Sequence, residues 1–93
     1  MIIGSRIFEL HIPGCQSLKE KRSVVKSLKK RLRNKFNVSV AEIDHQNLWQ
    51  RTTIAVVAVN SNGAYLNGLL DKILTMIESE RRITILTVET EYL

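Results

Sequence analysis

Apolar residues recur along the chain in two different periods, and these periods predict six elements. The run Ile2–Ile12 is rich in Ile, Phe and Leu and ends at the turn pair Pro13-Gly14, so it predicts a first strand. Ser17-Leu18-Lys19-Glu20 fits a capping box, which places the start of a helix there. The apolar residues that follow have the spacing of a helix that buries one stripe: Leu18, Val25, Leu28, Leu32 and Phe36.

The second half of the chain predicts two more strands, a helix and a last strand. Val38–Ile43 and Thr52–Val59 are strand-like, and the mostly polar stretch Asp44–Gln50 connects them as a hairpin loop. Asn60-Ser61-Asn62-Gly63 offers a cap for a second helix. Ile83–Tyr92 is expected to close the chain as a strand. The apolar stripe of the second helix consists of Leu66, Leu69, Leu70, Ile73 and Ile77.

This order of elements predicts an α+β fold of the ferredoxin-like βαββαβ type. Two right-handed strand-helix-strand units give a four-stranded antiparallel sheet of order 4-1-3-2, with both helices on one face. The 93 residues, 44% of them apolar, suit a single domain, 1–93, with little interior for an elaborate catalytic pocket.

The other face of the sheet is expected to be open and apolar. Alternation in the first strand sends one set of side chains to one face, Ile2, Phe8, Leu10 and Ile12, and another set to the opposite face, Ile3, Ile7, Glu9 and His11. The third strand has apolar residues on both faces, Ile54, Val56 and Ala58 against Ala55, Val57 and Val59. An apolar surface of this size predicts a homodimer, or a docked partner, through the open face.

All of the excess positive charge lies in the first helix. The segment from Lys19 to Lys35 contains nine basic residues and one acidic residue, a net charge of +8, whereas the rest of the chain has five basic and eight acidic residues, a net charge of −3. At 100° per residue, six of the cations fall within about a third of the helix circumference. We name this set the basic ridge: Lys19, Arg22, Lys26, Lys29, Lys30 and Arg33.

The basic ridge predicts binding to an acidic partner, and RNA fits it best. A solvated surface is the alternative, but such surfaces usually mix charges of both signs four residues apart. The predicted sheet offers no set of aromatic side chains for base stacking, so contacts are expected to be phosphate-led and weakly sequence-specific. Trp49, with Arg51 beside it, is either a cover for the end of the core or a secondary RNA contact.

Residues that could perform chemistry are few, and we expect no catalytic site, metal or cofactor. The only candidate metal or acid-base cluster consists of His11 and His45 with Glu9, Glu42 and Asp44. These residues lie on the first strand and at the end of the second strand, which the third strand separates by about 10 Å between backbones, too far for a zinc site. Cys15 precedes a helix start, where a thiol pKa can fall, but it lacks an oriented base. The loop Pro13–Lys19 also lacks the glycine-rich phosphate cradle ending in Arg of the acylphosphatases, which share this topology.

A cytoplasmic location is expected. The longest apolar run, Ile54–Val59, is far shorter than the roughly 20 residues that span a bilayer. The first residues do not form a secretory signal. The single cysteine, Cys15, cannot form an internal disulfide and suits a reducing compartment.

Two stretches of the sequence resemble the YlxP-like family of small bacterial proteins. The first is His11-Ile12-Pro13-Gly14 followed by Ser17–Arg22, and the second runs from Val38-Ser39-Val40-Ala41-Glu42 through Asp44-His45-Gln46 to Leu48-Trp49-Gln50-Arg51. The resemblance implies a ferredoxin-like fold, a cytoplasmic bacterial protein and no established activity or catalytic residues. Genes of this family often lie among those for transcription termination, translation initiation and ribosome maturation, which fits an association with RNA or the ribosome.

The sequence therefore predicts a non-enzymatic, dimeric, cytoplasmic protein that binds RNA or a ribonucleoprotein through the basic ridge, with Trp49 and Arg51 as a secondary contact. A dimeric small-molecule or regulatory module, or a protein-interaction module, is the alternative, and a hydrolase using His11 or Cys15 is a third. A metabolite that stabilises the protein against heat, where RNA does not, would distinguish the second class.

Overall fold

The computed structural model describes all 93 residues and contains the six expected elements in the expected order. Every strand boundary lies within one residue of its prediction. The elements are β1 (Ile2–His11), α1 (Leu18–Lys35), β2 (Ser39–Asp44), β3 (Arg51–Asn60), α2 (Gly63–Glu78) and β4 (Thr84–Tyr92).

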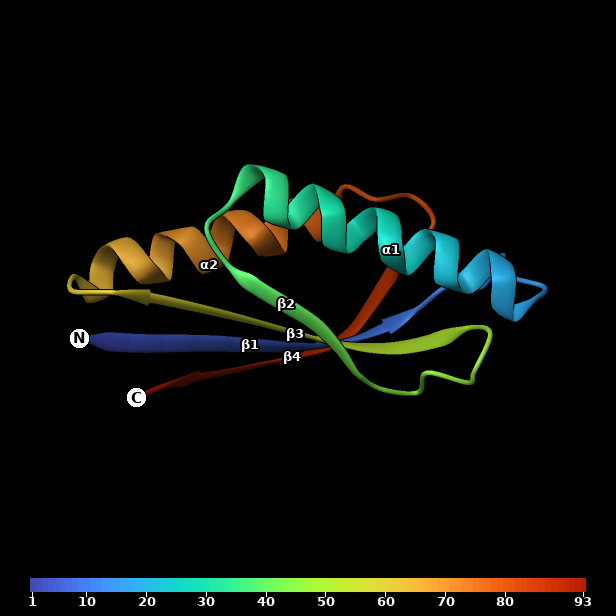
Figure 1. Ribbon diagram of the computed structural model, residues 1–93, viewed down its shortest axis with the longest axis horizontal. Coiled ribbons are helices and arrows are strands. Elements are labelled where there is room, and N and C mark those ends of the chain that lie inside the picture. The colour runs from blue at the N-terminus through green and yellow to red at the C-terminus, as the bar shows by residue number, and fades with distance from the viewer.

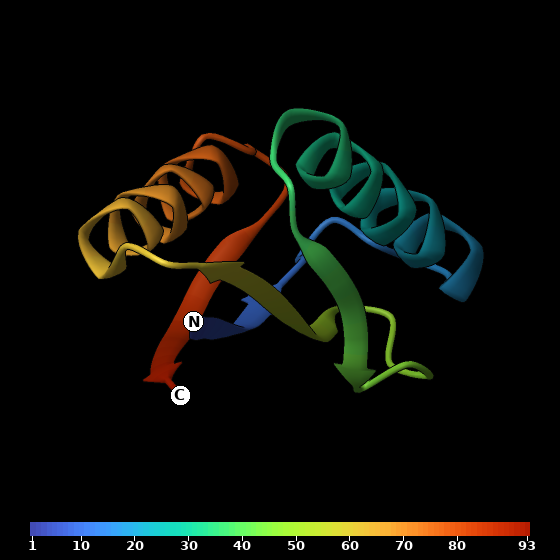
Figure 2. The same cartoon turned by 60° about the vertical axis from the view of Figure 1, so that its left-hand side comes forward.

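The four strands form one antiparallel sheet of order β2-β3-β1-β4, which is the predicted order read from the other edge. Both helices lie on one face of this sheet, and the opposite face is uncovered (Figures 1 and 2). The α+β ferredoxin-like fold is thus confirmed. The topology places α1 over the β2 side of the sheet, while β4 forms the other edge.

Both helices begin at the positions that the capping residues in the sequence predicted. The Ser17 hydroxyl oxygen accepts a hydrogen bond from the Glu20 backbone N–H at 3.1 Å, and the Glu20 carboxylate accepts one from the Gln16 N–H, one residue before the partner in a standard capping box. Asn62 caps α2 by accepting from the Tyr65 N–H at 3.0 Å. Neither helix combines the length and the apolar composition needed to cross a lipid bilayer.

The core lies between the helices and the sheet. Alternate side chains of β1 are buried beneath the helices. Phe8 and Leu10 are fully buried, and Ile12, which directly follows the strand, is almost fully buried. Gly4 continues this series, and a Cβ atom there would lie 2.9 Å from a methyl group of Leu66, so glycine permits the close approach of α2 to the sheet. The helices contribute the other large side chains of the core, among them Leu28, Leu32, Leu70, Ile73 and Ile77.

The open face of the sheet carries the apolar side chains that alternation predicted. Val57 and Val59 on β3 are 39% and 57% exposed, and on β1 Ile3 pairs with Val59 and Ile7 with Ala55 on the same face. Burying such a surface against a partner would be favourable. The homodimer expected through this face stays a prediction.

Candidate nucleic-acid interface

The basic ridge lies along one side of α1, as the helical spacing predicted. Five of its six side chains line a shallow groove of about 570 Å³ between α1 and the neighbouring strand β2, and Lys19 lies beyond the groove at the first turn of the helix. All ridge residues are exposed except Lys29, which is half-buried. The lining of the groove is Arg22, Val25, Lys26, Lys29, Lys30, Arg33, Asn34 and Glu42.

None of the ridge cations has a carboxylate partner within 4 Å. All seven ion pairs of the structure are formed by other residues. Arg33 instead donates a hydrogen bond to the backbone carbonyl of Val40 at 2.7 Å, which fixes its guanidinium against β2. The ridge is therefore an uncompensated row of positive charge, as an anion-binding surface requires.

Glu42 is the one acidic residue that lines the groove, and its carboxylate already has hydrogen-bond donors within the protein. Its carboxylate accepts from Lys21 Nζ and from the Thr52 hydroxyl, both at 2.5 Å. Lys21 belongs to α1, but its side chain is fully buried, and Nζ also donates to the backbone carbonyls of His45 and Gln46 at 2.8 and 3.3 Å. This cluster joins α1 to β2 and to the loop after it, and it removes Lys21 from the charge that a ligand meets.

Trp49 lies on this loop, at the end of α1 where the ridge begins. Its side chain is 53% exposed. Lys21 holds one part of the loop, and Gln50 holds the other, because its amide nitrogen donates to the carbonyls of Pro13 and Cys15 at 3.2 and 3.0 Å. Trp49 is therefore an accessible aromatic side chain on an anchored loop.

Arg51, the other expected secondary contact, does not join the ridge. It lies at the start of β3, and its guanidinium pairs with Glu9 at 3.2 Å. Glu9 also accepts from the Thr53 hydroxyl at 2.6 Å. Because Glu9 and Arg51 point to the open face of the sheet, Arg51 is separated from α1 by the sheet itself.

The candidate cluster of histidines and carboxylates is divided between the two faces of the sheet. Glu42 turns under α1, whereas His45, in the left-handed backbone region at φ 61°, brings Nε2 within 3.5 Å of the Glu9 carboxylate on the open face. The third strand does separate β1 from β2, as expected, but the His45 side chain, from the loop after β2, reaches across to Glu9 of β1. No three His, Cys, Asp or Glu side chains gather in a set that could ligate a metal ion.

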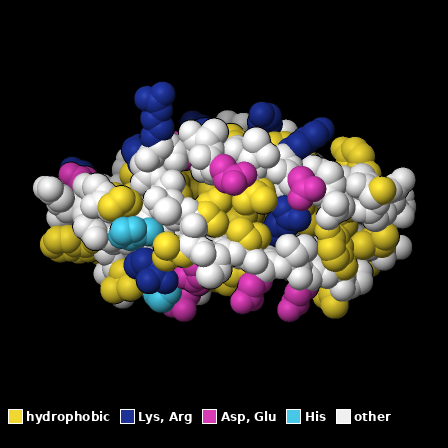
Figure 3. All heavy atoms as spheres, turned by 180° about the vertical axis from the view of Figure 1, so that it is seen from behind, with side chains coloured by type: hydrophobic (Ala, Val, Ile, Leu, Met, Phe, Trp, Pro, Cys, Tyr) yellow, Lys and Arg dark blue, Asp and Glu magenta, His cyan; other side chains and the backbone are white.

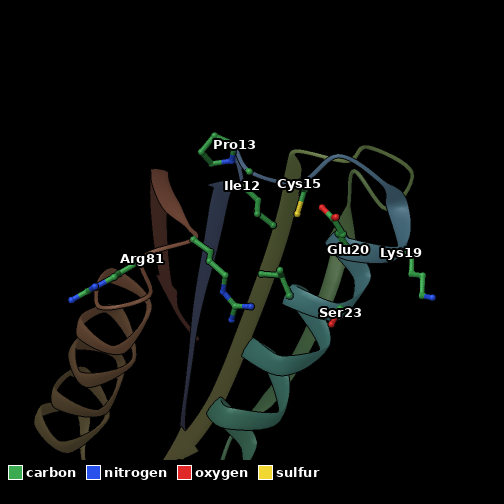
Figure 4. Close-up of a pocket in the computed structure, with 10 residues that line it drawn as sticks. Ile12, Pro13, Cys15, Lys19, Glu20, Ser23 and Arg81 are labelled. Carbon is green, nitrogen blue, oxygen red and sulfur yellow. The ribbon is translucent and has the colours of Figure 1, made fainter.

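A second hollow, of about 620 Å³, lies between the β1–α1 loop, the first turns of α1 and the loop before β4. Figure 4 shows the Cys15 sulfur beside the Glu20 carboxylate, with Arg81 extending away from the pocket. Burial, and then the charge of Glu20, raise the pKa of the Cys15 thiol. This shift is opposite to that of a reactive thiol, and no histidine lines the pocket as a base.

The loop before β4 is held by an ion-pair cluster around Glu80. Its carboxylate accepts from Arg82, at 2.9 and 3.2 Å, and from Arg31 of α1 at 2.7 Å. The hydrogen bonds from Arg82, followed by those from the Arg82 backbone and Arg31, lower the pKa of Glu80 to about 2, although burial opposes the shift. Glu80 therefore links the loop that follows α2 to α1 through its ion pair with Arg31.

We expect the Glu80 cluster to contribute a pH-dependent part of the stability. A carboxyl with a lowered pKa stabilises the fold at pH values above its unfolded pKa, near 4.3, and this contribution falls away as the pH drops towards 2. Urea denaturation of the native protein and of a Glu80→Gln variant should show a large difference at pH 7 and a much smaller one at pH 2. A difference that is constant with pH would contradict this role.

Comparison with known proteins supports the resemblance found in the sequence. Residues 3–90 match a family model described as "Protein of unknown function (DUF503)". The chain is 42% identical over 87 residues to "Uncharacterized protein YlxP" of Bacillus subtilis (strain 168), a match that covers 89% of this chain and 95% of that protein. Among solved structures, "De novo designed protein Foldit4" is similar in fold, with a TM-score of 0.54 at 14% identity over the whole chain and 97% of the designed one.

Proposed function

The chain belongs to the DUF503 family, and we propose that it is a non-enzymatic, cytoplasmic protein that binds RNA, free or within a ribonucleoprotein, through the basic ridge of α1. The observation that carries this proposal is the row of six cations on one side of α1, none of which has a carboxylate partner. A surface that served only solubility would keep mixed charges and local ion pairs.

The geometry of the ridge favours contact with a phosphate backbone. From Lys19 to Arg33 the helix rises about 21 Å, so its cations can follow several successive phosphates. Five of the ridge cations line the groove beside α1, so a strand of RNA could lie along the helix next to β2. Since the ridge has no aromatic side chain, it would bind with weak preference for sequence.

An NMR titration with a short single-stranded RNA tests the proposal directly. The backbone amides of α1 between Lys19 and Arg33, and those of β2 along the groove, should shift progressively as RNA is added. Amides of the open face, such as Ile7 and Val57, serve as the internal control and should stay in place. Shifts confined to the open face, or none at low salt, would contradict binding by the ridge.

Trp49 is expected to add a stacking contact at the beginning of the ridge. Base stacking on an aromatic side chain contributes about 1 to 3 kcal/mol, so Trp49→Ala should weaken RNA binding at least fivefold, whereas Trp49→Phe should retain most of the affinity. Stacking involves no counterion, so the salt dependence should be the same in both variants. Full affinity in Trp49→Ala would mean that Trp49 only covers the end of the core.

A further inference from the structure

The edge strand β4 is exposed along nearly its whole length. Of its nine residues only Ile85 is partly buried, and Leu86, Val88 and Tyr92 are 45%, 37% and 45% exposed. Figure 3, which views the molecule from the side opposite to Figure 1, shows hydrophobic atoms gathered in the middle of this surface and acidic side chains along its lower rim. A long exposed edge strand with several apolar side chains is a template for pairing with another strand.

The backbone of β4 offers free hydrogen-bonding groups to such a strand. Ile3 and Leu93 exchange both backbone hydrogen bonds, at 2.9 and 2.8 Å, so the odd-numbered residues of β4 after its bulge face β1. By the alternation of an antiparallel ladder, Val88, Thr90 and Tyr92 direct their N–H and C=O groups outward. The strand contains no lysine and no proline, the residues that commonly protect an edge from pairing.

We propose that two copies of this chain pair through β4, antiparallel and about a two-fold axis, into one continuous eight-stranded sheet. The charge along the strand favours a second copy as the occupant. Arg81, which has no carboxylate partner, precedes β4, and Arg82 beside it is paired with Glu80, whereas Glu89 and Glu91 lie in the second half of the strand. Antiparallel pairing brings the basic end of each strand to the acidic end of the other, and parallel pairing would join like charges.

The same charges select the register. The helices of both copies lie on one side of a continuous sheet only when outward-facing residues pair with each other. An axis at Glu89 would place the two Glu89 carboxylates opposite each other, and an axis at Thr90 would oppose Glu89 with Glu91 twice. Of these three registers, only the axis at Val88, which opposes Glu89 with Thr87, leaves no pair of like charges, and we therefore place Val88 beside its own copy.

This dimer is independent of RNA binding, but it would shape any such binding. Because α1 lies over the β2 edge and the copies meet at β4, the two basic ridges would lie at the two far ends of the dimer. This dimer is an alternative to the homodimer expected through the open face of the sheet, because it leaves that face uncovered on both copies.

Cysteine crosslinking tests the register. In a Cys15→Ser background, which removes the only native cysteine, Val88→Cys should form a disulfide-linked dimer under mild oxidation, since the paired Cα atoms would lie about 5.5 Å apart. Thr90→Cys is the matched control and should stay uncrosslinked, because each copy of that residue lies two positions from the axis. Crosslinking of Thr90→Cys alone, or of neither variant, would overturn the Val88 register.

Sedimentation equilibrium tests the interface without relying on that register. The native protein should be a dimer at high micromolar concentration, and Val88→Lys should make it a monomer with an unchanged circular dichroism spectrum. Val59→Lys, an equally large change on the open face, should leave the dimer intact. A monomeric native protein, or a dimer broken by Val59→Lys and kept by Val88→Lys, would overturn the proposal.

Discussion

A variant with three reversed ridge charges, Lys26→Glu, Lys29→Glu and Lys30→Glu, is expected to bind single-stranded RNA at least a hundredfold more weakly than the native protein at physiological salt. Each charge-assisted contact contributes about 1.5 to 3 kcal/mol, and three of them are replaced by repulsion. The three lysines form no ion pair and lie outside the core, so the fold should be retained. Fluorescence anisotropy with labelled RNA measures the loss, and circular dichroism checks the fold.

A matched control separates the ridge from the net charge of the protein. Lys35→Glu, Lys72→Glu and Arg81→Glu change the charge by the same amount at exposed residues outside the ridge. These residues also have no carboxylate partner. The control should lose only a small part of the affinity. Equal losses in the two variants would assign the binding to net charge and remove the ridge from the mechanism.

The largest effect on stability is expected at Lys21. Removing one partner of a buried ion pair costs about 3 to 5 kcal/mol, because the other charge is left without compensation. Lys21→Ala should therefore lower the free energy of unfolding by roughly that amount, as measured by urea denaturation, since the Lys21 side chain is fully buried against Glu42. Lys30→Ala, at an exposed site of the same helix, should change it by less than about 0.5 kcal/mol.

Replacing both partners distinguishes the pair from simple loss of packing. A Lys21→Met and Glu42→Met double variant leaves no buried charge and keeps similar volumes, so it should recover much of the stability that Lys21→Ala loses. If the double variant is as unstable as the sum of the two single changes, the ion pair itself is not the source of the effect.

The fold was predictable because each element carries its own periodic pattern and its own cap. Ser17 and Asn62 announce the two helix starts, and the alternation in β1 separates Phe8 and Leu10 from Ile7 and Glu9. With six elements in βαββαβ order, handedness leaves one arrangement of the sheet. The ridge was predictable for a similar reason, since the angle between side chains on a helix follows from their spacing alone.

The burial of Lys21 could have been found in the sequence. In the predicted apolar stripe of α1, Leu18 and Val25 are seven positions apart, and Lys21 lies between them at a spacing of three and four. Its partner Glu42 likewise follows Val40 on the helix-facing side of β2. A cation and a carboxylate that interrupt two facing apolar patterns indicate a buried pair.

The placements of Arg51 and His45 could not be predicted in the same way. Arg51 lies one residue before the predicted strand. A shift of one residue in the register decides whether its side chain faces α1 or the open face of the sheet. His45 reaches Glu9 because its backbone is left-handed, which non-glycine residues adopt mainly when the surrounding contacts require it. Those contacts are tertiary, with Lys21 bonded to the carbonyl of His45.

The salt dependence of RNA binding tests the central claim most directly, because the number of counterions released on binding reports how many phosphates the protein contacts. If four or five ridge cations engage a single strand, the logarithm of the association constant should fall against the logarithm of salt concentration with a slope of about −3. The triple ridge variant should bind weakly with a slope of about −1, and the matched control should keep about −3. A native slope near zero, or an unchanged slope in the ridge variant, would contradict the role of the basic ridge.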